Sequence, residues 1–233
     1  MPFFSDTFTA GANENLEAHT PDLGTSWTEL WATTSGTGWR VNSVVDELVQ
    51  VQAAATGAIY TADTPYPSAH YGVTVTLTLL LPVANLPVYL FLRIQDVANL
   101  YAARVKYGSG TCSLYKKVRG VWTALGSAFD SPAIGSVLRL EMTDSDLEFY
   151  DDGVLVASAY DADIVGAGKA GLGGGGGAEL VTSTDGTHSF NRLDNFSVNT
   201  LRDRSRILIP SRLPTRIRGT PSMSLGGEYG RLP

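Results

Sequence analysis

Apolar and polar residues alternate along much of the chain between about residue 39 and residue 200. In YGVTVTLTLLL, residues 71–81, valine and leucine occupy one face of an extended segment and threonine the other. The segment VYLFLRIQD, residues 88–96, has the same period, and the prolines of PVANLP between them exclude one continuous strand. The pattern therefore predicts two strands that each turn one side toward a core.

Turn signals divide the following chain into further strands. Residues 100–128 and residues 136–161 each read as three strands, and a last strand is expected at residues 191–199. The turns are predicted at residues 108–110, 119–120, 144–145 and 152–153. No long amphipathic helix appears before residue 200. The expected fold is an all-β antiparallel sandwich of the jelly-roll type over residues 1–200, followed by an extended arm at residues 201–233.

The order of short motifs resembles the concanavalin A-like and laminin G-like jelly-roll domains found in phage structural proteins. FSDTFTAGANENLEAHTPDLGTSWTEL resembles the opening of those domains, and LEFYDDGVLVAS, AGKAGLGGGGG and RLDNFSV resemble their C-terminal half. The resemblance covers about residues 3–200 and implies that the closing strand pairs back near the N-terminus. The glycine run is no phosphate loop, because it lacks the Lys-Ser/Thr pair and a following helix. We expect glycine there to permit close backbone approach.

Composition and charge separate the chain into a body and a basic arm. Residues 201–233 hold seven arginines against Asp203 and Glu228, a net charge of +5. The other residues hold ten bases and 21 acids, a net charge of −11. The single cysteine, Cys112, excludes an intramolecular disulfide, and the N-terminus has no basic segment followed by an apolar one, so no signal peptide is expected. No apolar stretch is long enough to cross a membrane as a helix.

The arm is predicted to dock onto copies of this chain or onto other assembly proteins. Pro210, Pro214 and Pro221 favour extended segments, and the apolar side chains between them need a partner surface. Interleaved arginines suit the carboxylates of an acidic body. Nucleic acid is a weaker partner because consecutive bases are missing, and a disordered tail is the remaining alternative. The predicted partner-binding residues are Arg206, Ile207, Leu208, Ile209, Arg212, Leu213, Arg216, Ile217 and Arg218.

The sequence gives no catalytic set. The resembled family includes glycoside hydrolases, which carry a Glu-x-Asp-x-Glu motif on one strand. In this sequence the position two residues after Glu141 is Thr143 and the position two residues after Glu148 is Tyr150, where the motif requires acidic residues. The three histidines do not have the spacing of a zinc site. We therefore expect a protein that is not an enzyme and that requires no cofactor.

Two binding features follow from the resemblance and the composition. Asp6 and Asp194 match the terminal-strand carboxylates that hold structural calcium in related folds, against the alternative that both are turn or capping carboxylates. Aromatic rings suit stacking on sugars, against the alternative of burial in the core. The candidate rings are Trp31, Trp39, Tyr60, Tyr66, Tyr71 and Trp122.

The function expected from these features is structural. A phage-type virion protein of the tail, fibre or capsid surface, with a lectin-like body, would combine the fold, the arm and the lack of an export signal. Such a protein would be assembled in the host cytoplasm, bind no membrane and no nucleic acid, and contact surface glycans through its body. The alternatives left open are a free carbohydrate-binding module and a glycoside hydrolase.

Overall fold

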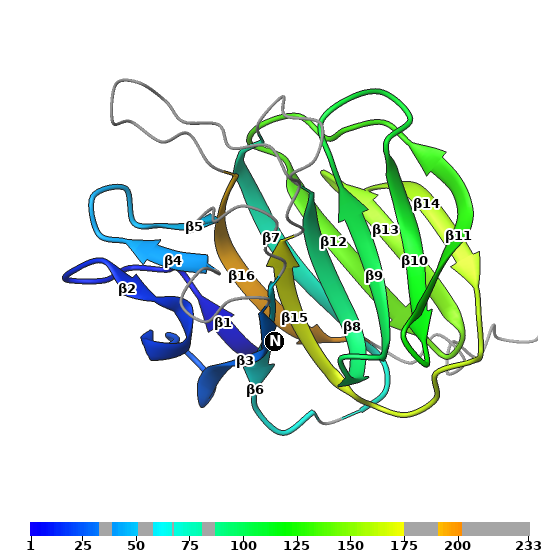
Figure 1. The fold of residues 1–233 in the computed structure, drawn as a ribbon, viewed down its shortest axis with the longest axis horizontal. Coiled ribbons are helices and arrows are strands. Elements are labelled where there is room, and N and C mark those ends of the chain that lie inside the picture. Colours follow the sequence, from blue (N-terminus) through cyan, green and yellow to red (C-terminus); the bar gives the residue numbers. More distant parts are fainter. Residues whose placement is uncertain (33–38, 51–57, 67, 81–86, 175–190, 202–233) are drawn as a thin grey trace, which may run out of the picture. The chain divides into compact units, whose positions relative to one another are not determined.

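The computed structural model describes residues 1–32, 39–50, 58–66, 68–80, 87–174 and 191–201. These residues belong to one compact unit, Met1–Arg202, in which two antiparallel sheets pack face to face (Figure 1). The predicted all-β sandwich is thereby confirmed. Of the predicted arm, only Leu201 is among the described residues. No helix in the described part has the length and apolarity of a membrane span.

One sheet has nine strands among the described residues. In order across the sheet they are β14 (Val154–Tyr160), β13 (Asp146–Asp151), β12 (Val137–Thr143), β7 (Tyr71–Leu79), β16 (Arg192–Thr200), β5 (Glu47–Gln50), β4 (Trp39–Asn42) and β2 (Glu14–Asn15), with β1 (Pro2–Asp6) also paired to β16. A short 3-10 helix, η1 (Leu16–Ala18), follows β2.

In the described part of the chain the other sheet has seven strands, and it supplies the face that carries the candidate site. In order across the sheet they are β11 (Val121–Phe129), β10 (Cys112–Val118), β9 (Asn99–Val105), β8 (Val88–Asp96), β15 (Lys169–Gly174), β6 (Ala58–Asp63) and β3 (Ser26–Ala32). The two predicted groups of three strands are confirmed as β9–β11 and β12–β14. Their tight turns use the left-handed backbone, for example Asp152 at φ 48° and Gly153 at φ 80°.

The core between the sheets follows the alternation of the sequence. Val73, Val75 and Leu77 of β7 are fully buried. The threonines between them are half-buried on the opposite face. Burying each such aliphatic side chain contributes roughly 1.5–3 kcal/mol. Strand β8 departs from this rule, because Phe91 and Ile94 are buried on the side away from the main core.

The two ends of the body meet, as the resemblance implied. Strand β1 pairs antiparallel with β16, so that Asp6 lies opposite Phe196. Phe4 packs edge-on against Phe196 and Trp27, with ring centroids 6.0 and 5.0 Å away. The N-terminal segment is therefore an integral part of the larger sheet.

Strand β15 shows why this segment is rich in glycine. A Cβ at Gly173 would lie 2.2 Å from the carbonyl oxygen of Ala58 and 2.8 Å from Cε2 of Phe91. A Cβ at Gly171 would lie 2.0 Å from the carbonyl oxygen of Tyr60. The predicted close backbone approach is confirmed for this part of the run, and the glycines from 175 onward are outside the described residues.

Candidate functional site

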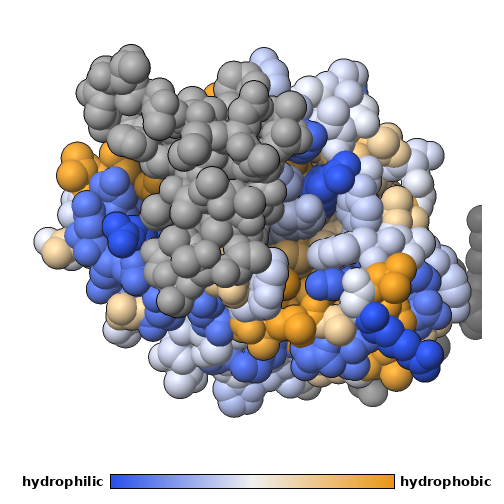
Figure 2. Space-filling view, in the orientation of Figure 1, coloured by the Kyte–Doolittle hydropathy of each residue, from blue (hydrophilic) through white to orange (hydrophobic). Residues whose placement is uncertain are grey.

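The outer face of the seven-stranded sheet, the side turned away from the core, carries a pocket walled by aromatic rings. Tyr89, Arg104, Tyr115 and Trp122 line this pocket of about 240 Å³. They come from β8, β9, β10 and β11, which lie side by side in Figure 1. The space-filling view in the same orientation shows apolar residues exposed among hydrophilic ones on this side of the molecule (Figure 2). We call these four residues the outer-face patch.

The rings of the patch support one another. Tyr89 stacks on Phe91 with centroids 5.6 Å apart and planes 6° apart. Trp122 lies 6.0 Å from both Tyr89 and Tyr115, nearly parallel to the first and perpendicular to the second. Trp122 nevertheless stays 42% exposed. The patch therefore presents an indole ring to solvent on a base of packed aromatic side chains.

Strand register explains why a hollow forms among such large residues. Tyr115 lies opposite Ala102 on β9 and Ala124 on β11. Tyr89 lies opposite Arg104 on one side and Gly173 on the other. Residues with small or no side chains thus alternate with the rings across the sheet, which leaves space above them.

Two cations border the rings. The guanidinium carbon of Arg104 lies 4.9 Å from the Tyr115 centroid, and Nζ of Lys117 lies 5.2 Å from the Trp122 centroid. Nη2 of Arg104 donates a hydrogen bond of 3.0 Å to the carbonyl oxygen of Thr111. The buried Nε of Arg104 has no hydrogen-bond partner among the described residues. Both contacts are cation–π interactions, and they hold positive charge at the rim of the pocket.

Burial sets the protonation of these groups. It raises the pKa of Tyr89, with the nearby charge of Arg104 only partly opposing the effect, so the phenol stays neutral. It lowers the pKa of Lys117, and the charge of Asp96 only partly compensates. The site therefore offers the neutral hydroxyl group of Tyr89 and, beside Trp122, the partly desolvated ammonium group of Lys117.

Most of the aromatic candidates from the sequence have other roles. Trp39, Tyr60 and Tyr71 are at most 1% exposed and belong to the core. Tyr66 is half-buried and donates to the carbonyl oxygen of Ala62 over 2.9 Å. The two exposed candidates, Trp31 and Trp122, lie on opposite edge strands of the seven-stranded sheet.

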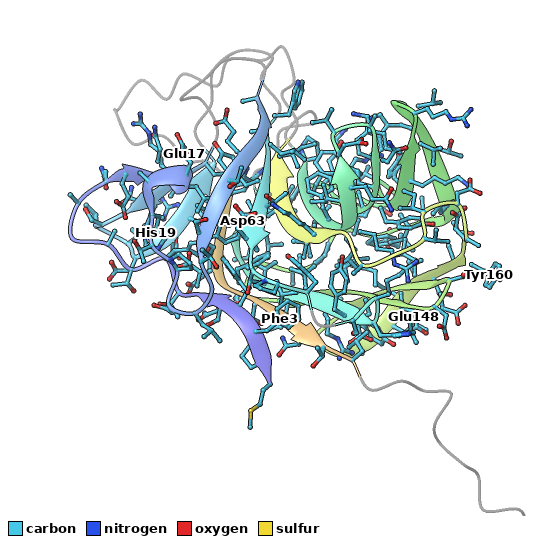
Figure 3. All side chains as sticks on the ribbon, turned by 90° about the horizontal axis from the view of Figure 1, so that it is seen from below. Phe3, Glu17, His19, Asp63, Glu148 and Tyr160 are labelled. Atoms are coloured by element: carbon cyan, nitrogen blue, oxygen red, sulfur yellow. The ribbon has the colours of Figure 1, made fainter. Side chains whose placement is uncertain are left out.

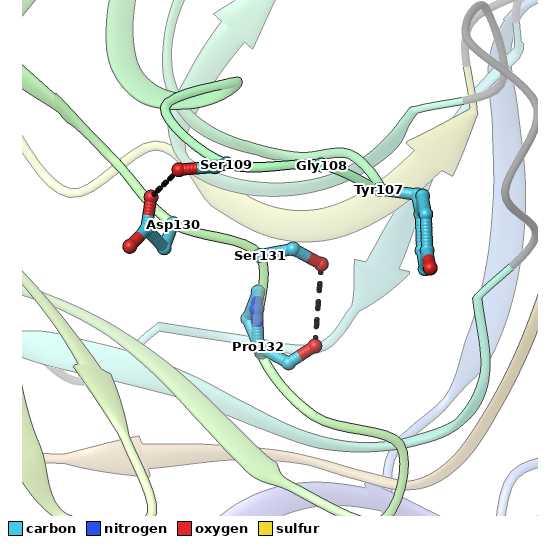
Figure 4. Close-up of a pocket in the computed structure, with 6 residues that line it drawn as sticks. All are labelled: Tyr107, Gly108, Ser109, Asp130, Ser131 and Pro132. Atoms are coloured by element: carbon cyan, nitrogen blue, oxygen red, sulfur yellow. Dashed lines mark hydrogen bonds between the residues drawn. The ribbon is translucent and has the colours of Figure 1, made fainter.

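A second, more open pocket lies between the β9–β10 turn and the segment after β11 (Figure 4). Oδ1 of Asp130 accepts from Oγ of Ser109 over 2.7 Å and from the backbone N–H of Gly110 over 2.8 Å. These bonds lower the pKa of Asp130 and fix its carboxylate. The pocket also exposes half of the Tyr107 ring. It has one ring and one ordered acceptor, whereas the outer-face patch has three rings.

The carboxylates proposed for calcium have other partners. Oδ1 of Asp6 accepts from the backbone N–H of Phe8 over 2.7 Å and lies 3.0 Å from Nε2 of His19. Oδ2 accepts from the indole N–H of Trp27 over 2.6 Å. A carboxylate has about four lone-pair sites, so Asp6 keeps little capacity for a cation.

Asp194 lies near other acids, and both of its carboxylate oxygens accept from the next residue, Asn195. It accepts from the backbone N–H of Asn195 over 2.7 Å. Burial raises its pKa, and the charges of Glu47, Asp6 and Asp46 add to that effect. Within the described residues, no group of three or more His, Cys, Asp or Glu could hold a metal ion. The residues present do not fit a calcium site at Asp6, and calcium stays a prediction from the fold.

The acidic hairpin β12–β13 forms a polar network rather than an open cleft in the described part of the chain. Glu141 lies opposite Glu148, a pairing that the sequence analysis did not consider. Arg139 forms a 2.9 Å ion pair with Glu141, which is nearly buried, and packs its guanidinium 4.2 Å from the Tyr150 centroid. Tyr150 in turn donates to Glu148 over 2.8 Å. These contacts give both carboxylates structural partners.

Three residues of the patch were not predicted from the sequence. Tyr89, Arg104 and Tyr115 lie at positions that alternate with core residues of β8, β9 and β10. The sequence contained one sign of this patch, the run VYLFL at residues 88–92. Its two aromatic residues alternate with core residues, so they lie on the outer face of the strand, where polar residues are expected. The nine predicted partner-binding residues, Arg206, Ile207, Leu208, Ile209, Arg212, Leu213, Arg216, Ile217 and Arg218, lie outside the described residues.

Comparison with known proteins identifies the fold. No family model matches the chain, and no curated protein matches its sequence. Among solved structures it is similar to the carbohydrate-binding module CBM66 from Bacillus subtilis, with a TM-score of 0.51 and 14% identity over 75% of this chain and 95% of that one.

Two further structures have the same architecture. The VIP36 exoplasmic/lumenal domain in its Ca²⁺/Man2-bound form has a TM-score of 0.52 and 9% identity, over 80% of this chain and 86% of that one. The carbohydrate recognition domain of Emp46p in its metal-free form has a TM-score of 0.51 and 8% identity, over 74% and 87%. At these identities the likeness shows the fold alone, a lectin-like jelly roll.

Proposed function

We propose that this protein is a non-catalytic glycan-binding module whose sugar contacts the outer-face patch. The observation that carries the proposal is the exposed Trp122 ring above Tyr89 and Tyr115, with Arg104 beside them. Sugar rings have apolar C–H faces that stack on aromatic rings and hydroxyls that bond to fixed polar groups. Pockets for drug-sized ligands measure roughly 300–1,000 Å³, so 240 Å³ suits about one sugar ring of a longer chain.

The names of the similar structures support this reading. One is a carbohydrate-binding module, another a carbohydrate recognition domain, and a third was solved with Man2. These names describe those proteins, and their folds are shared by this chain. The local support comes from this chain's own rings.

A glycan array followed by calorimetry on the best ligand tests the proposal. Trp122→Ala should weaken binding at least tenfold, or about 1.4 kcal/mol, because the stacking ring is lost. Trp31→Ala is the matched control, since Trp31 is equally exposed, at 43%, on the opposite edge strand. Unchanged binding by Trp122→Ala, or equal losses in both variants, would contradict the proposal.

A second candidate function concerns assembly, and the contrast between an acidic body and a basic arm favours it. In this proposal the protein is a structural component of a phage-type virion, assembled in the host cytoplasm. The arm at residues 201–233 would bind copies of the chain or other virion proteins. The net charges of −11 and +5 support such binding between molecules.

Deletion of residues 206–233 tests the assembly proposal. The shortened protein should keep the thermal unfolding of the full chain and lose self-association or incorporation into particles, measured by light scattering and by particle purification. Normal incorporation of the shortened protein would refute the role of the arm. It would leave the glycan proposal untouched, because the patch lies within the body.

A glycoside hydrolase remains the third reading. It predicts turnover of a bound glycan that Glu148→Gln abolishes. The contacts of Glu141 and Glu148 favour a structural role instead.

A further inference from the structure

The outer-face patch contains one cation, Arg104, and Lys117 lies beside its Trp122 ring; neither forms an ion pair with a carboxylate in the described part of the chain. Four other bases of the body are held by carboxylates there: Lys116, Arg139, Lys169 and Arg192. Arg104 and Lys117 form no such ion pair among the described residues, and neither do Arg40, Arg93, Lys106 and Arg119, which lie outside the patch. The positive charge of Arg104 and Lys117 is therefore available at the rim of the pocket.

The described aspartates that contact this part of the sheet form ion pairs or hydrogen bonds with residues other than Arg104 and Lys117. Asp161 and Asp163 are both bound by Lys116, with Asp163 2.5 Å from Nζ. Asp96 accepts hydrogen bonds of 2.6 and 3.0 Å from the backbone N–H of Ala98 and from Nδ2 of Asn99, and its charge acts on Lys117 without an ion pair between them in the described part of the chain. Burial lowers the pKa of Lys117, and the charge of Asp96 opposes this effect only in part.

Arg104 has donors left for a ligand. Among its contacts with described residues, Nη2 donates to Thr111, and the guanidinium packs against Tyr115. Its Nε is buried without a described partner, which is an unfavourable state for a donor. A ligand on the outer face cannot reach this buried Nε, so the donors left are the remaining N–H groups of Nη1 and Nη2, whose fork matches a planar carboxylate.

We propose that the outer-face patch selects a sugar that carries a carboxylate, with the sugar ring stacked on Trp122 and the carboxylate bound by Arg104. Lys117 adds a second positive charge beside the same indole ring. This inference rests on the proposed glycan-binding function and narrows its ligand to acidic polysaccharides, such as those built of uronic acids. A neutral sugar would leave Arg104 without an ion-pair partner among the described residues.

Matched pairs of polysaccharides provide the test. Alginate, pectate, hyaluronan and xanthan are each compared with the same polymer after reduction of its carboxyl groups to neutral alcohols. The full chain should bind at least one acidic form, and its reduced form at least tenfold more weakly. Binding should also weaken as salt increases, because part of the affinity is electrostatic.

Variants test whether the preference for acidic over carboxyl-reduced polysaccharides depends on Arg104. Arg104→Gln should bring the acidic and reduced forms to similar affinity, while Trp122→Ala should weaken both. Arg104→Lys, which keeps the charge without the fork, should retain only part of the preference. Arg40→Gln is the matched control, because Arg40 is exposed on β4 of the other sheet. Thermal unfolding of each variant shows whether it is folded.

The outcomes separate this inference from the proposed function. Glycan binding that depends on Trp122 but is indifferent to carboxyl reduction would overturn the acidic-sugar inference and leave glycan binding intact. A preference for sulfated glycans over carboxylated ones would overturn it as well. Absence of binding to every polysaccharide and to the glycan array would refute both.

Discussion

The indole nitrogen of Trp27 lies 2.6 Å from Oδ2 of Asp6, across 21 residues of sequence. Both groups are almost completely buried, where a bond to a charged acceptor is stronger than at the surface. The same carboxylate accepts from the backbone of Phe8 and contacts His19. Asp6 thus ties the first strand to β3 through Trp27 and to the loop after η1 through His19, and Figure 3 shows His19 at the opposite end of the body from Tyr160.

Removing this carboxylate should strongly destabilise the body. Asp6→Ala leaves the Trp27 and Phe8 donors buried and unpaired, and we expect a loss of about 3–5 kcal/mol in the free energy of unfolding. Urea denaturation measures it. The double variant Asp6→Ala/Trp27→Phe should lose less than the sum of the two single changes, because the orphaned indole donor is removed too. Strict additivity would show that the bond is unimportant.

His19 makes stability depend on pH. Burial alone would lower its pKa, but hydrogen bonds to Asp6 and Glu14 and their negative charges raise it above the ordinary value of about 6.5. A raised pKa in the folded state means that protonated His19 stabilises the fold fully below the unfolded pKa. This contribution is lost as pH rises through the folded pKa.

The stability difference between the wild type and His19→Gln should therefore be larger at pH 5.5 than at pH 9. Denaturation in urea at both pH values measures the difference, and NMR titration of the imidazole gives the folded pKa directly. A difference that grows toward alkaline pH would contradict the assignment. His70→Gln is the matched control, because His70 is also half-buried and its Nε2 lies 3.6 Å from Oδ1 of an aspartate, Asp144.

Gly173 should not tolerate alanine. Its added Cβ would lie within 2.2 Å of the Ala58 carbonyl oxygen and would push Phe91, the support of Tyr89 in the patch. We expect a loss of about 1–3 kcal/mol or more in unfolding free energy, together with weaker glycan binding. Gly11→Ala is the control, since a Cβ there meets nothing within 4 Å. Equal stability of the two variants would show that β15 can move away from β6.

Substitution of Asp194 tests whether this carboxylate holds a calcium ion or is only repelled by neighbouring acids. Its pKa is raised by burial and by neighbouring acids, so its charge is unfavourable at neutral pH. Asp194→Asn should leave the melting temperature unchanged or slightly higher at pH 7, within about 1 kcal/mol, and EDTA should not lower the melting temperature of the wild type. A drop in both experiments would establish a structural metal at the joined terminal strands.

The sequence determined several strands of this protein, because burial in strands such as β7 and β13 alternates with a period of two. β7 and the hairpins of β9–β14 follow from alternation and from turns such as Asp152-Gly153, which depend only on neighbouring residues. The glycines of β15 likewise showed a backbone constraint, although not which strand would press against it. The motif order then sufficed for a lectin-like sandwich with joined ends.

Only the tertiary structure decided which polar and aromatic groups meet. Trp39, Tyr60 and Tyr71 looked like candidates for binding but are buried, and Asp6 looked like a metal ligand but bonds to Trp27 and His19. The patch takes its residues from four strands, so its existence depends on the register between them and on the alanines that leave space beside Tyr115. Alternation assigns a residue to a face of its own strand, whereas pairing between strands decides its neighbours across the sheet.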